Sequence, residues 1–365
     1  MRNLFSVLPF VALTFFCWGM YGPILHEGQY AMGENGVPSS LRPLICVGVA
    51  YFIIAVIFPI AILKSKGEKG HWTMTGFIWS FAAGVAGAIG ALGIVLAFKF
   101  QGKPVYVMPL VFGLAPVVNT FVTMFMARSF KQASTIFYLG VLIVAIGAAG
   151  VMFFKPSKPH KAHSEDHVAA TDESASEKVP QESDTDASTA TPPPSKEVGD
   201  VAFGNYIVIS LFIGLTALCW GSYGPVLHKG QAKMSGSKLR PLLCVGLAYF
   251  AVAVVIPVLL MPVFPEPGGF PVGGTLWSLG AGAAGAFGAL GIIYAFNFGG
   301  KPIFVMPLVF GLAPVVNTLT TTISSGAYGN INPLFVMSLI LVICGAITVL
   351  IFAPRPAPAP KPETT

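Results

Sequence analysis

The sequence predicts an all-α integral membrane protein with ten transmembrane helices, arranged as two inverted five-helix repeats. The first observation is composition: of 365 residues, 54% are hydrophobic and 10% are charged, whereas about a quarter of the residues in a soluble domain are charged. The second is that several apolar runs exceed the roughly 18 to 20 residues that cross a bilayer as a helix. The third is an internal duplication, since PVYVMPLVFGLAPVVNT at 104–120 recurs as PIFVMPLVFGLAPVVNT at 302–318.

The duplication extends through both halves of the chain. CWGMYGPILHEGQ at 17 matches CWGSYGPVLHKGQ at 219, and LRPLICVGVAYF at 41 matches LRPLLCVGLAYF at 239. Each half holds five apolar runs, namely 6–25, 43–63, 74–98, 104–127 and 135–154, then 204–227, 241–263, 275–297, 302–325 and 334–353. Because five is odd, the second half enters the membrane from the opposite side, as in transporters with inverted repeats.

The loop charges predict the orientation. With a cytoplasmic N-terminus, the short outside loops hold only Arg42, Lys99 and Lys103, and the other Lys and Arg residues lie inside, apart from those of the 155–203 segment. The positive-inside rule therefore favours the cytoplasmic membrane with both termini in the cytoplasm. The first run is expected to stay as a span because it lacks a small-residue cleavage site and its repeat partner lies deep in the chain.

Four segments divide the chain. The repeats occupy 1–154 and 204–353, joined by a hydrophilic linker at 155–203 and followed by a tail at 354–365. The linker is rich in Ser, Thr, Pro, Glu and Asp, so it is expected to be disordered and to lie outside.

This plan resembles the drug/metabolite transporter superfamily, the EamA-like ten-helix carriers. The resemblance covers both halves and rests on the span count, the repeat plan and a "WG" motif with a following proline in the first helix of each half, at Trp18, Gly19, Pro23 and at Trp220, Gly221, Pro225. The glycine-rich third span and the "GKP" before the fourth look closest to the bacterial sugar-uptake and rhamnose-permease branch. The resemblance implies transport by alternating access.

Other classes of protein fit the sequence poorly. The basic residues form no stripe that would bind nucleic acid, although the net charge is +6. The cysteines Cys17, Cys46, Cys219, Cys244 and Cys344 all lie in apolar runs without CxxC spacing, so we expect neither disulfides nor a metal site. No nucleophile with a base and no phosphate-binding loop is present, so we expect no enzyme and no cofactor.

The candidate substrate-binding residues are aromatic and amide side chains that recur in both halves: Trp18, Tyr21, Asn119, Trp220, Tyr223 and Asn317. Aromatic faces and polar tips suit a polyol or ring-shaped substrate, and Trp18 and Trp220 are placed deep in their spans. The alternative for Trp and Tyr is interfacial anchoring. We expect Tyr51, Trp79, Tyr249 and Trp277 to serve this belt or general packing.

Two further patterns have open alternatives. The prolines Pro109, Pro116, Pro307 and Pro314 each leave a helix carbonyl partly free. Such carbonyls either coordinate a ligand or only permit a kink. The third and eighth spans carry a glycine at every third position, from 84 to 93 and from 282 to 291, which favours close helix packing over backbone contact with a substrate.

No Asp, Glu, Lys, Arg or His lies inside the ten predicted spans, which disfavours a strongly charged substrate. The nearest ionisable groups lie at span ends. His26 and His228 are candidates for gating or coupling, with plain interfacial histidines as the alternative. Arg42, Lys103, Arg240 and Lys301 are possible contacts for an anion, with snorkelling anchors as the alternative for the lysines.

The sequence therefore favours a carrier for a small, polar, uncharged metabolite, with a sugar-like solute as first expectation and the lipid bilayer as its surroundings. An exporter of amino acids and a membrane sensor or scaffold that uses the linker remain alternatives. The substrate, the direction of transport and any coupling ion stay open.

Overall fold

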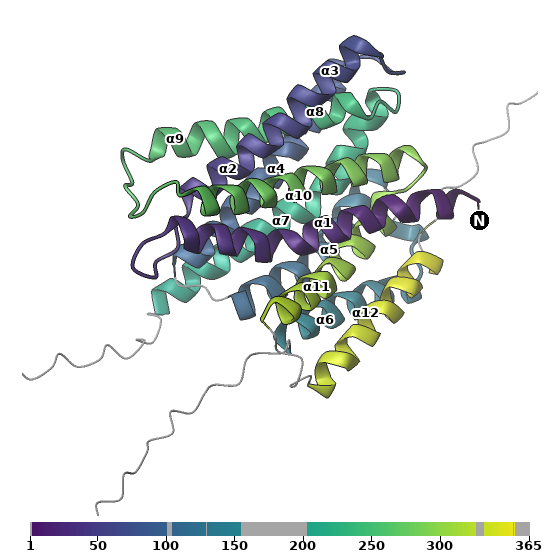
Figure 1. Cartoon of the computed structure of the whole chain (residues 1–365). Helices are drawn as coiled ribbons and strands as arrows, with labels where there is room; N and C mark the ends of the chain where they lie inside the picture. The colour runs from purple at the N-terminus through teal and green to yellow at the C-terminus, as the bar shows by residue number, and fades with distance from the viewer. Residues whose placement is uncertain are drawn as a thin grey trace, which may run out of the picture.

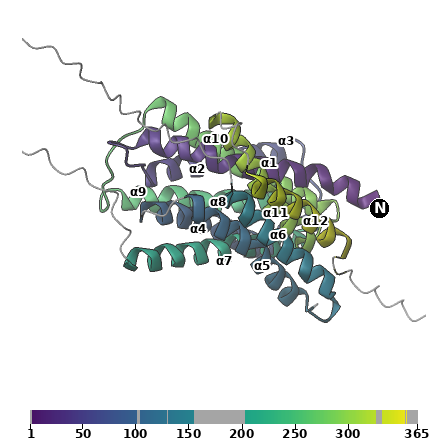
Figure 2. The same ribbon diagram turned by 90° about the horizontal axis from the view of Figure 1, so that it is seen from below.

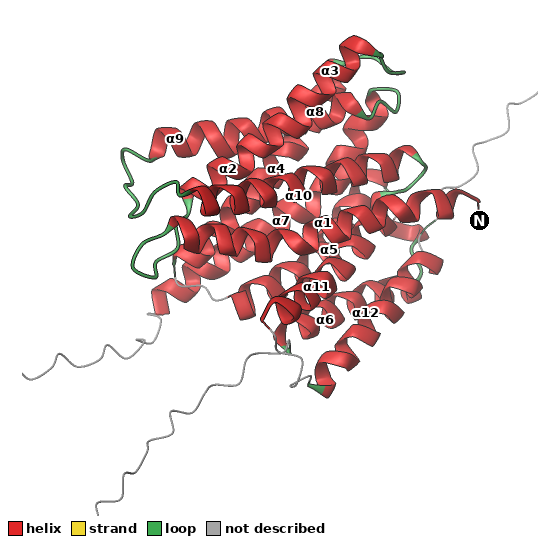
Figure 3. Ribbon diagram, in the orientation of Figure 1, coloured by secondary structure: helices red, strands yellow, loops and turns green. Residues whose placement is uncertain are grey.

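The computed structural model describes residues 2–100, 104–128, 130–154, 203–325, 332–352 and 354. These residues are almost entirely helical, and the β-pairing among them is one isolated bridge between Glu34 and Val37 (Figure 3). Within the described ranges, 8 helical segments are long and apolar enough to cross a membrane, and two shorter apolar helices lie at Thr135–Val151 and Pro333–Val349. By length and composition, this is a multi-pass membrane protein. The predicted linker and tail lie outside the described residues, apart from Phe203 and Pro354.

A helix covers each of the apolar runs that the sequence shows. The elements of the first half are α1 (Arg2–Met32), α2 (Leu41–Phe52), η1 (Ile53–Ile57), α3 (Phe58–Ser65), α4 (Met74–Lys99), α5 (Pro104–Ala127), η2 (Phe130–Gln132) and α6 (Thr135–Phe153). Those of the second half are α7 (Phe203–Lys233), α8 (Leu239–Phe250), η3 (Ala251–Val255), α9 (Ile256–Leu260), α10 (Val272–Asn297), α11 (Pro302–Ser325) and α12 (Pro333–Phe352).

The first helix of each half is longer than the apolar run that predicts it. Hydropathy falls at the HEGQ and HKGQ segments, but the helices continue to Met32 and Lys233. Soon after these ends the backbone takes left-handed φ values, of 52° at Asn35 and 55° at Ser235, each followed by a glycine with positive φ. Such residues commonly end a helix, so the true ends are marked by turn residues and not by polarity.

The second span of each half carries a π-helical segment at the same position. Phe58 N–H donates to the carbonyl of Ile53, and Ile256 N–H donates to that of Ala251, both five residues back. Pro59 and Pro257 follow immediately and have no N–H. The hydrogen-bond register therefore shifts next to a proline, in a form of helix that frequently occurs at functional sites.

The two halves are interleaved. α1 and α2 of the first half pack on α10 of the second, and α7 and α8 of the second pack on α4 of the first, while α6 and α12 pack on each other (Figure 1). Viewed from below, α1, α2 and α10 lie together on one side, and α4, α7 and α8 lie on the other (Figure 2).

The glycine stripes make this interleaving possible. A Cβ on Gly84 would lie 2.8 Å from the Cα of Val245, and one on Gly282 would lie 2.7 Å from the Cα of Val47. Glycines at these positions let two backbones approach closely. The packing role that the sequence predicts for the third and eighth spans is therefore confirmed at Gly84 and Gly282.

Candidate functional site

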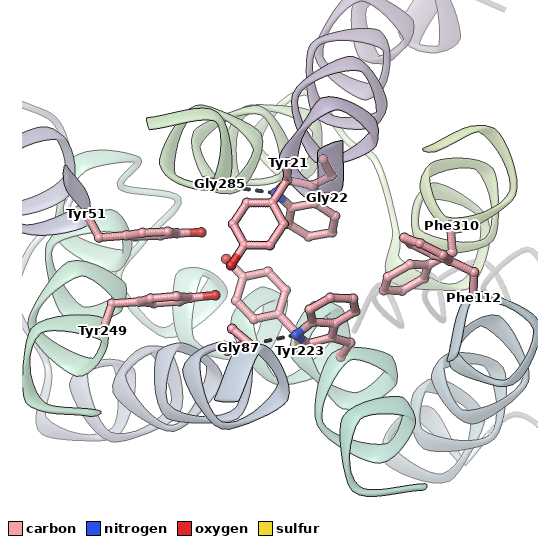
Figure 4. A pocket seen from close by; sticks show the side chains of 12 residues that line it. Tyr21, Gly22, Tyr51, Gly87, Phe112, Tyr223, Tyr249, Gly285 and Phe310 are labelled. Atoms are coloured by element: carbon pink, nitrogen blue, oxygen red, sulfur yellow. Dashed lines mark hydrogen bonds between the residues drawn. The ribbon is translucent and has the colours of Figure 1, made fainter. Parts of the chain in front are cut away.

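A cavity lies between the halves, about midway along α1 and α7 and next to the ends of α2 and α8, where the π-helical segments of the second spans begin (Figure 4). Ten of its lining residues form matched pairs from the two repeats, Trp18/Trp220, Tyr21/Tyr223, Tyr51/Tyr249, Gly87/Gly285 and Phe112/Phe310, and Gly22 and Ala91 complete the wall. The cavity volume is about 60 Å³, which is enough for roughly four to six waters.

The two tryptophans are held by the glycine-rich helix of the opposite half. Trp18 Nε1–H donates to the carbonyl of Gly285 at 3.2 Å, and Trp220 Nε1–H donates to that of Gly87, also at 3.2 Å. A Cβ on Gly288 would lie 2.1 Å from Trp18 Nε1, so the indole needs a glycine beneath it. The structure therefore places both tryptophans in the cavity wall, where the sequence predicts them, with their N–H groups already occupied.

A threonine one turn before each tryptophan strengthens this contact. Thr14 Oγ1 lies 2.9 Å from the carbonyl of Phe10 and 3.1 Å from that of Gly288. In the other half, Thr216 Oγ1 donates to the carbonyl of Gly90 at 3.2 Å. These hydroxyls are buried, so their bonds across the halves stabilise the helix pairing on which the cavity depends.

Four tyrosines supply the polar atoms of the cavity. Tyr21 and Tyr223 have buried hydroxyls with no hydrogen-bond partner. Tyr51 and Tyr249 stack face to face, with ring centroids 3.7 Å apart and planes 3° from parallel. All four hydroxyls point toward the same part of the cavity (Figure 4).

The position of Tyr51 and Tyr249 corrects one expectation. These side chains are 3% and 8% exposed, so of the two expectations for them, the interfacial belt is wrong and packing agrees with their burial. Each lies against a glycine, because a Cβ on Gly285 would meet the ring of Tyr51 and one on Gly87 would meet that of Tyr249. Sequence reasoning misses their place in the cavity, although their matched positions eight residues before Pro59 and Pro257 are a usable signal.

Two of the prolines follow phenylalanines that line the cavity. Phe112 and Phe310 precede Pro116 and Pro314 by four residues and line the wall. Because proline has no N–H, it cannot donate to the carbonyl four residues back. The carbonyl of Pro116 itself accepts a hydrogen bond from Thr120 Oγ1 at 2.9 Å. Pro307 lies in the second turn of α11 and is not among the described lining residues. The side chain of Pro109 lies outside the described residues.

The two asparagines do not line the cavity, contrary to the sequence prediction. Asn119 is buried, and its Nδ2 donates to the carbonyl of Pro302 at 3.0 Å, while its Oδ1 has no partner. Asn317 is buried behind Gly22, where a Cβ would lie 2.8 Å from Asn317 Nδ2. Asn119 thus joins α5 to the start of α11, and Asn317 lies against α1.

A carboxylate clamp joins the halves at one end of the helices. Glu266, in the loop between α9 and α10, accepts hydrogen bonds from Ser40 N at 2.9 Å and Leu41 N at 3.0 Å, at the start of α2. Arg42 donates to the carbonyls of Glu266 and Pro267 at 2.7 and 2.8 Å. The carboxylate thus accepts hydrogen bonds from N–H groups that have no partner within the helix. Its negative charge also lies at the positive end of the helix dipole, which is a favourable arrangement.

A matching clamp lies at the other end. Glu68, in the loop between α3 and α4, accepts hydrogen bonds from Lys238 N at 2.8 Å and from Leu239 N at 3.2 Å, at the start of α8. Arg240 Nη1 lies 3.6 Å from Glu68 Oε2 and donates to the carbonyl of Lys69 at 3.4 Å. Each half therefore caps the second span of the other.

The clamps show that two of the predicted anion-binding residues have partners within the chain. Arg42 and Arg240, predicted as possible contacts for an anionic ligand, contact loop carbonyls, and Arg240 also contacts Glu68. Lys103 lies outside the described residues. Lys301 lies just before α11, and burial lowers the pKa of its ammonium; its contact with an anion stays a prediction.

The two histidines differ in surroundings. His26 is exposed, with its ring 4.6 Å from that of Tyr30. His228 is half-buried, with the ring of Phe296 5.0 Å away at right angles. Neither lines the cavity, and a gating role for them stays a prediction.

Comparison with known proteins identifies the fold only. No family model matches the chain, and no curated protein matches it in sequence. A solved crystal structure of another protein is similar, with a TM-score of 0.59 and 15% identity over 96% of this chain and 99% of that chain. At this identity, the similarity shows that an experimentally determined structure shares the helical arrangement.

Proposed function

We propose that the protein is a membrane carrier that moves a small, polar, uncharged metabolite by alternating access. It crosses the cytoplasmic membrane with ten helices in two inverted repeats, with both termini in the cytoplasm. One observation carries the proposal: an uncharged aromatic cavity lies midway along helices from both halves, and a matched carboxylate clamp lies at each end of those helices. A site between two pseudo-symmetric gates is what alternating access needs.

Helix directions support the inversion. Along α1, Trp18 lies against Gly288 and Gly28 lies against Ser278, so α1 and α10 are antiparallel. Within the first half, α1 and α4 run the same way, because the span from α2 to α3 returns between them. α10 therefore runs opposite to α4, its counterpart in the repeat, which an inverted pair requires.

Loop contacts support the assigned topology. The positive-inside rule puts the α1–α2 and α9–α10 loops outside, and these loops contact each other through Arg42 and Glu266. It puts the α3–α4 and α7–α8 loops inside, and these contact each other through Glu68 and Lys238. Each contact joins loops that the rule assigns to one side.

The "WG" motif gives physical support to the resemblance with the drug/metabolite transporter superfamily. Trp18 and Trp220 line the cavity. Their neighbours allow close helix approach, since a Cβ on Gly19 would lie 2.7 Å from the carbonyl oxygen of Ala313, and one on Gly221 would lie 2.8 Å from that of Ala115. The motif thus combines a cavity wall with a close crossing of helices.

Uptake into liposomes tests the function. The purified full chain, reconstituted with a panel of uncharged polyols, sugars and amides, is expected to give saturable uptake that empty liposomes lack. Trp18→Ala and Trp220→Ala should lower the rate, while Trp277→Ala should not, because Trp277 lies outside the cavity wall and is 50% exposed. Saturable uptake confined to charged solutes, or none with any solute, contradicts the proposal.

A further inference from the structure

The cavity has two chemically different ends. Tyr51 and Tyr249 lie at one end, Phe112 and Phe310 lie at the other, and Tyr21 and Tyr223 lie between them (Figure 4). No charged side chain is among the described residues that line it. A ligand that fills it therefore meets phenol hydroxyls at one end and hydrocarbon rings at the other.

The hydroxyls are the groups available to bind a ligand. The indole N–H groups of Trp18 and Trp220 are already bonded to glycine carbonyls. The hydroxyls of Tyr21 and Tyr223 are buried and unpartnered. Buried polar groups in native proteins normally have partners, so two matched exceptions that point into one cavity call for a partner from outside the chain.

The chemistry of a phenol limits that partner. A neutral phenol both donates and accepts a hydrogen bond, so it suits a hydroxyl or amide better than a group that only accepts or only donates. Moving a full charge into a site without a countercharge is costly. The rings at the other end give no hydrogen bonds, and they favour an apolar ring or alkyl group.

We propose that the cavity binds an uncharged, amphipathic molecule, with its hydroxyl-bearing end on Tyr21 and Tyr223 and its hydrocarbon end against Phe112 and Phe310. This inference rests on the proposed function for its biological meaning, since the ligand would be the transported solute. It narrows the substrate class, because it disfavours molecules that are polar on every side.

Three ring probes of similar size separate the possibilities. cis-1,2-Cyclohexanediol is polar at one end, myo-inositol is polar all round, and cyclohexylammonium carries a charge. Titration of the full-length purified protein, followed by calorimetry, is expected to show that the diol binds at least about tenfold more tightly than the other two, the effect of roughly one unpaired polar group. Tighter binding of inositol overturns the amphipathic assignment, and tighter binding of the cation overturns the uncharged one. Absence of diol binding overturns both.

Matched tyrosine variants test which hydroxyls bind. The double variant Tyr21→Phe/Tyr223→Phe should weaken diol binding about tenfold or more, since it removes two hydrogen bonds without changing ring volume. The control is Tyr206→Phe on α7, whose ring is 49% exposed and outside the cavity. Unchanged diol affinity in the double variant overturns the role of these hydroxyls.

A failure of this binding assignment can be distinguished from a failure of the proposed transport function. If the diol binds in the expected order but does not enter liposomes, the site assignment holds and the carrier function fails. If an all-polar solute is transported with no dependence on Tyr21 and Tyr223, the carrier function holds and the inference fails.

Discussion

Tyr51 lies face to face with Tyr249, with ring centroids 3.7 Å apart, and this pair joins the second spans of the two halves at the cavity. The rings of the next residues, Phe52 and Phe250, are also in contact, with centroids 4.6 Å apart. Each pair is formed by one residue and its own counterpart in the repeat, so the pairs mark where the repeats cross. A solute in the cavity contacts both halves at this crossing, which is how binding would be coupled to their relative movement.

The close contact under Trp18 predicts a large effect from one methyl group. Gly288→Ala on α10 should lower the free energy of unfolding by about 1–3 kcal/mol, the usual range for overpacking. The reason is that the new Cβ would lie 2.1 Å from Trp18 Nε1. Thermal unfolding in detergent measures the change.

Gly273→Ala is the matched control in the same helix. A Cβ there meets nothing within 4 Å, and alanine favours a helix over glycine by about 1 kcal/mol. The control should be neutral or stabilising. Equal destabilisation by both variants would show that the indole does not pack on Gly288.

The unpartnered hydroxyls of Tyr21 and Tyr223 are expected to serve ligand binding and not to stabilise the folded protein. Tyr21→Phe should leave the melting temperature unchanged or raise it, because it removes a buried hydroxyl that has no partner. Thr14→Val, which removes a buried hydroxyl with partners, should lower it. A fall with Tyr21→Phe as large as that with Thr14→Val would mean that Tyr21 has a partner in the folded protein.

Removal of the carboxylate from either clamp should lower the free energy of unfolding by a similar amount. Glu266→Ala and Glu68→Ala should each destabilise the protein by about 1–3 kcal/mol, because each leaves N–H groups at a helix start without their carboxylate. Glu27→Ala is the control, since Glu27 is exposed on α1. Denaturation of the three variants under one set of conditions compares their free energies of unfolding. If Glu266→Ala and Glu68→Ala lower this free energy no more than Glu27→Ala does, the clamps are contradicted.

Hydropathy and repetition predict the positions of the helices, because a bilayer demands a minimum length of apolar helix. They miss the ends of α1 and α7, since helix termination depends on turn residues such as Asn35 and Ser235. They also miss the interleaving of the halves, because pairing between α1 and α10 is a contact between distant parts of the chain.

The site is only partly predictable for the same reason. Depth within a span and recurrence in both halves bring Trp18 and Tyr21 to attention, and both line the cavity. Asn119 recurs equally well, but its amide reaches the start of α11. Which face of a helix meets the cavity depends on its neighbours, and Tyr51 contacts both Gly285 of α10 and Tyr249 of α8.

Alternating access is tested most directly by the reactivity of a single cysteine at Ala91, which lines the cavity and is 3% exposed. Ala91→Cys, in a chain whose five native cysteines are replaced, is treated with a membrane-impermeant thiol reagent from either side of oriented vesicles. Carriers expose one site to the two sides in turn, so we predict reaction from both sides. We also predict that Glu266→Ala increases reaction from one side and Glu68→Ala from the other. Reaction from one side only, unchanged by either clamp variant, would contradict the carrier.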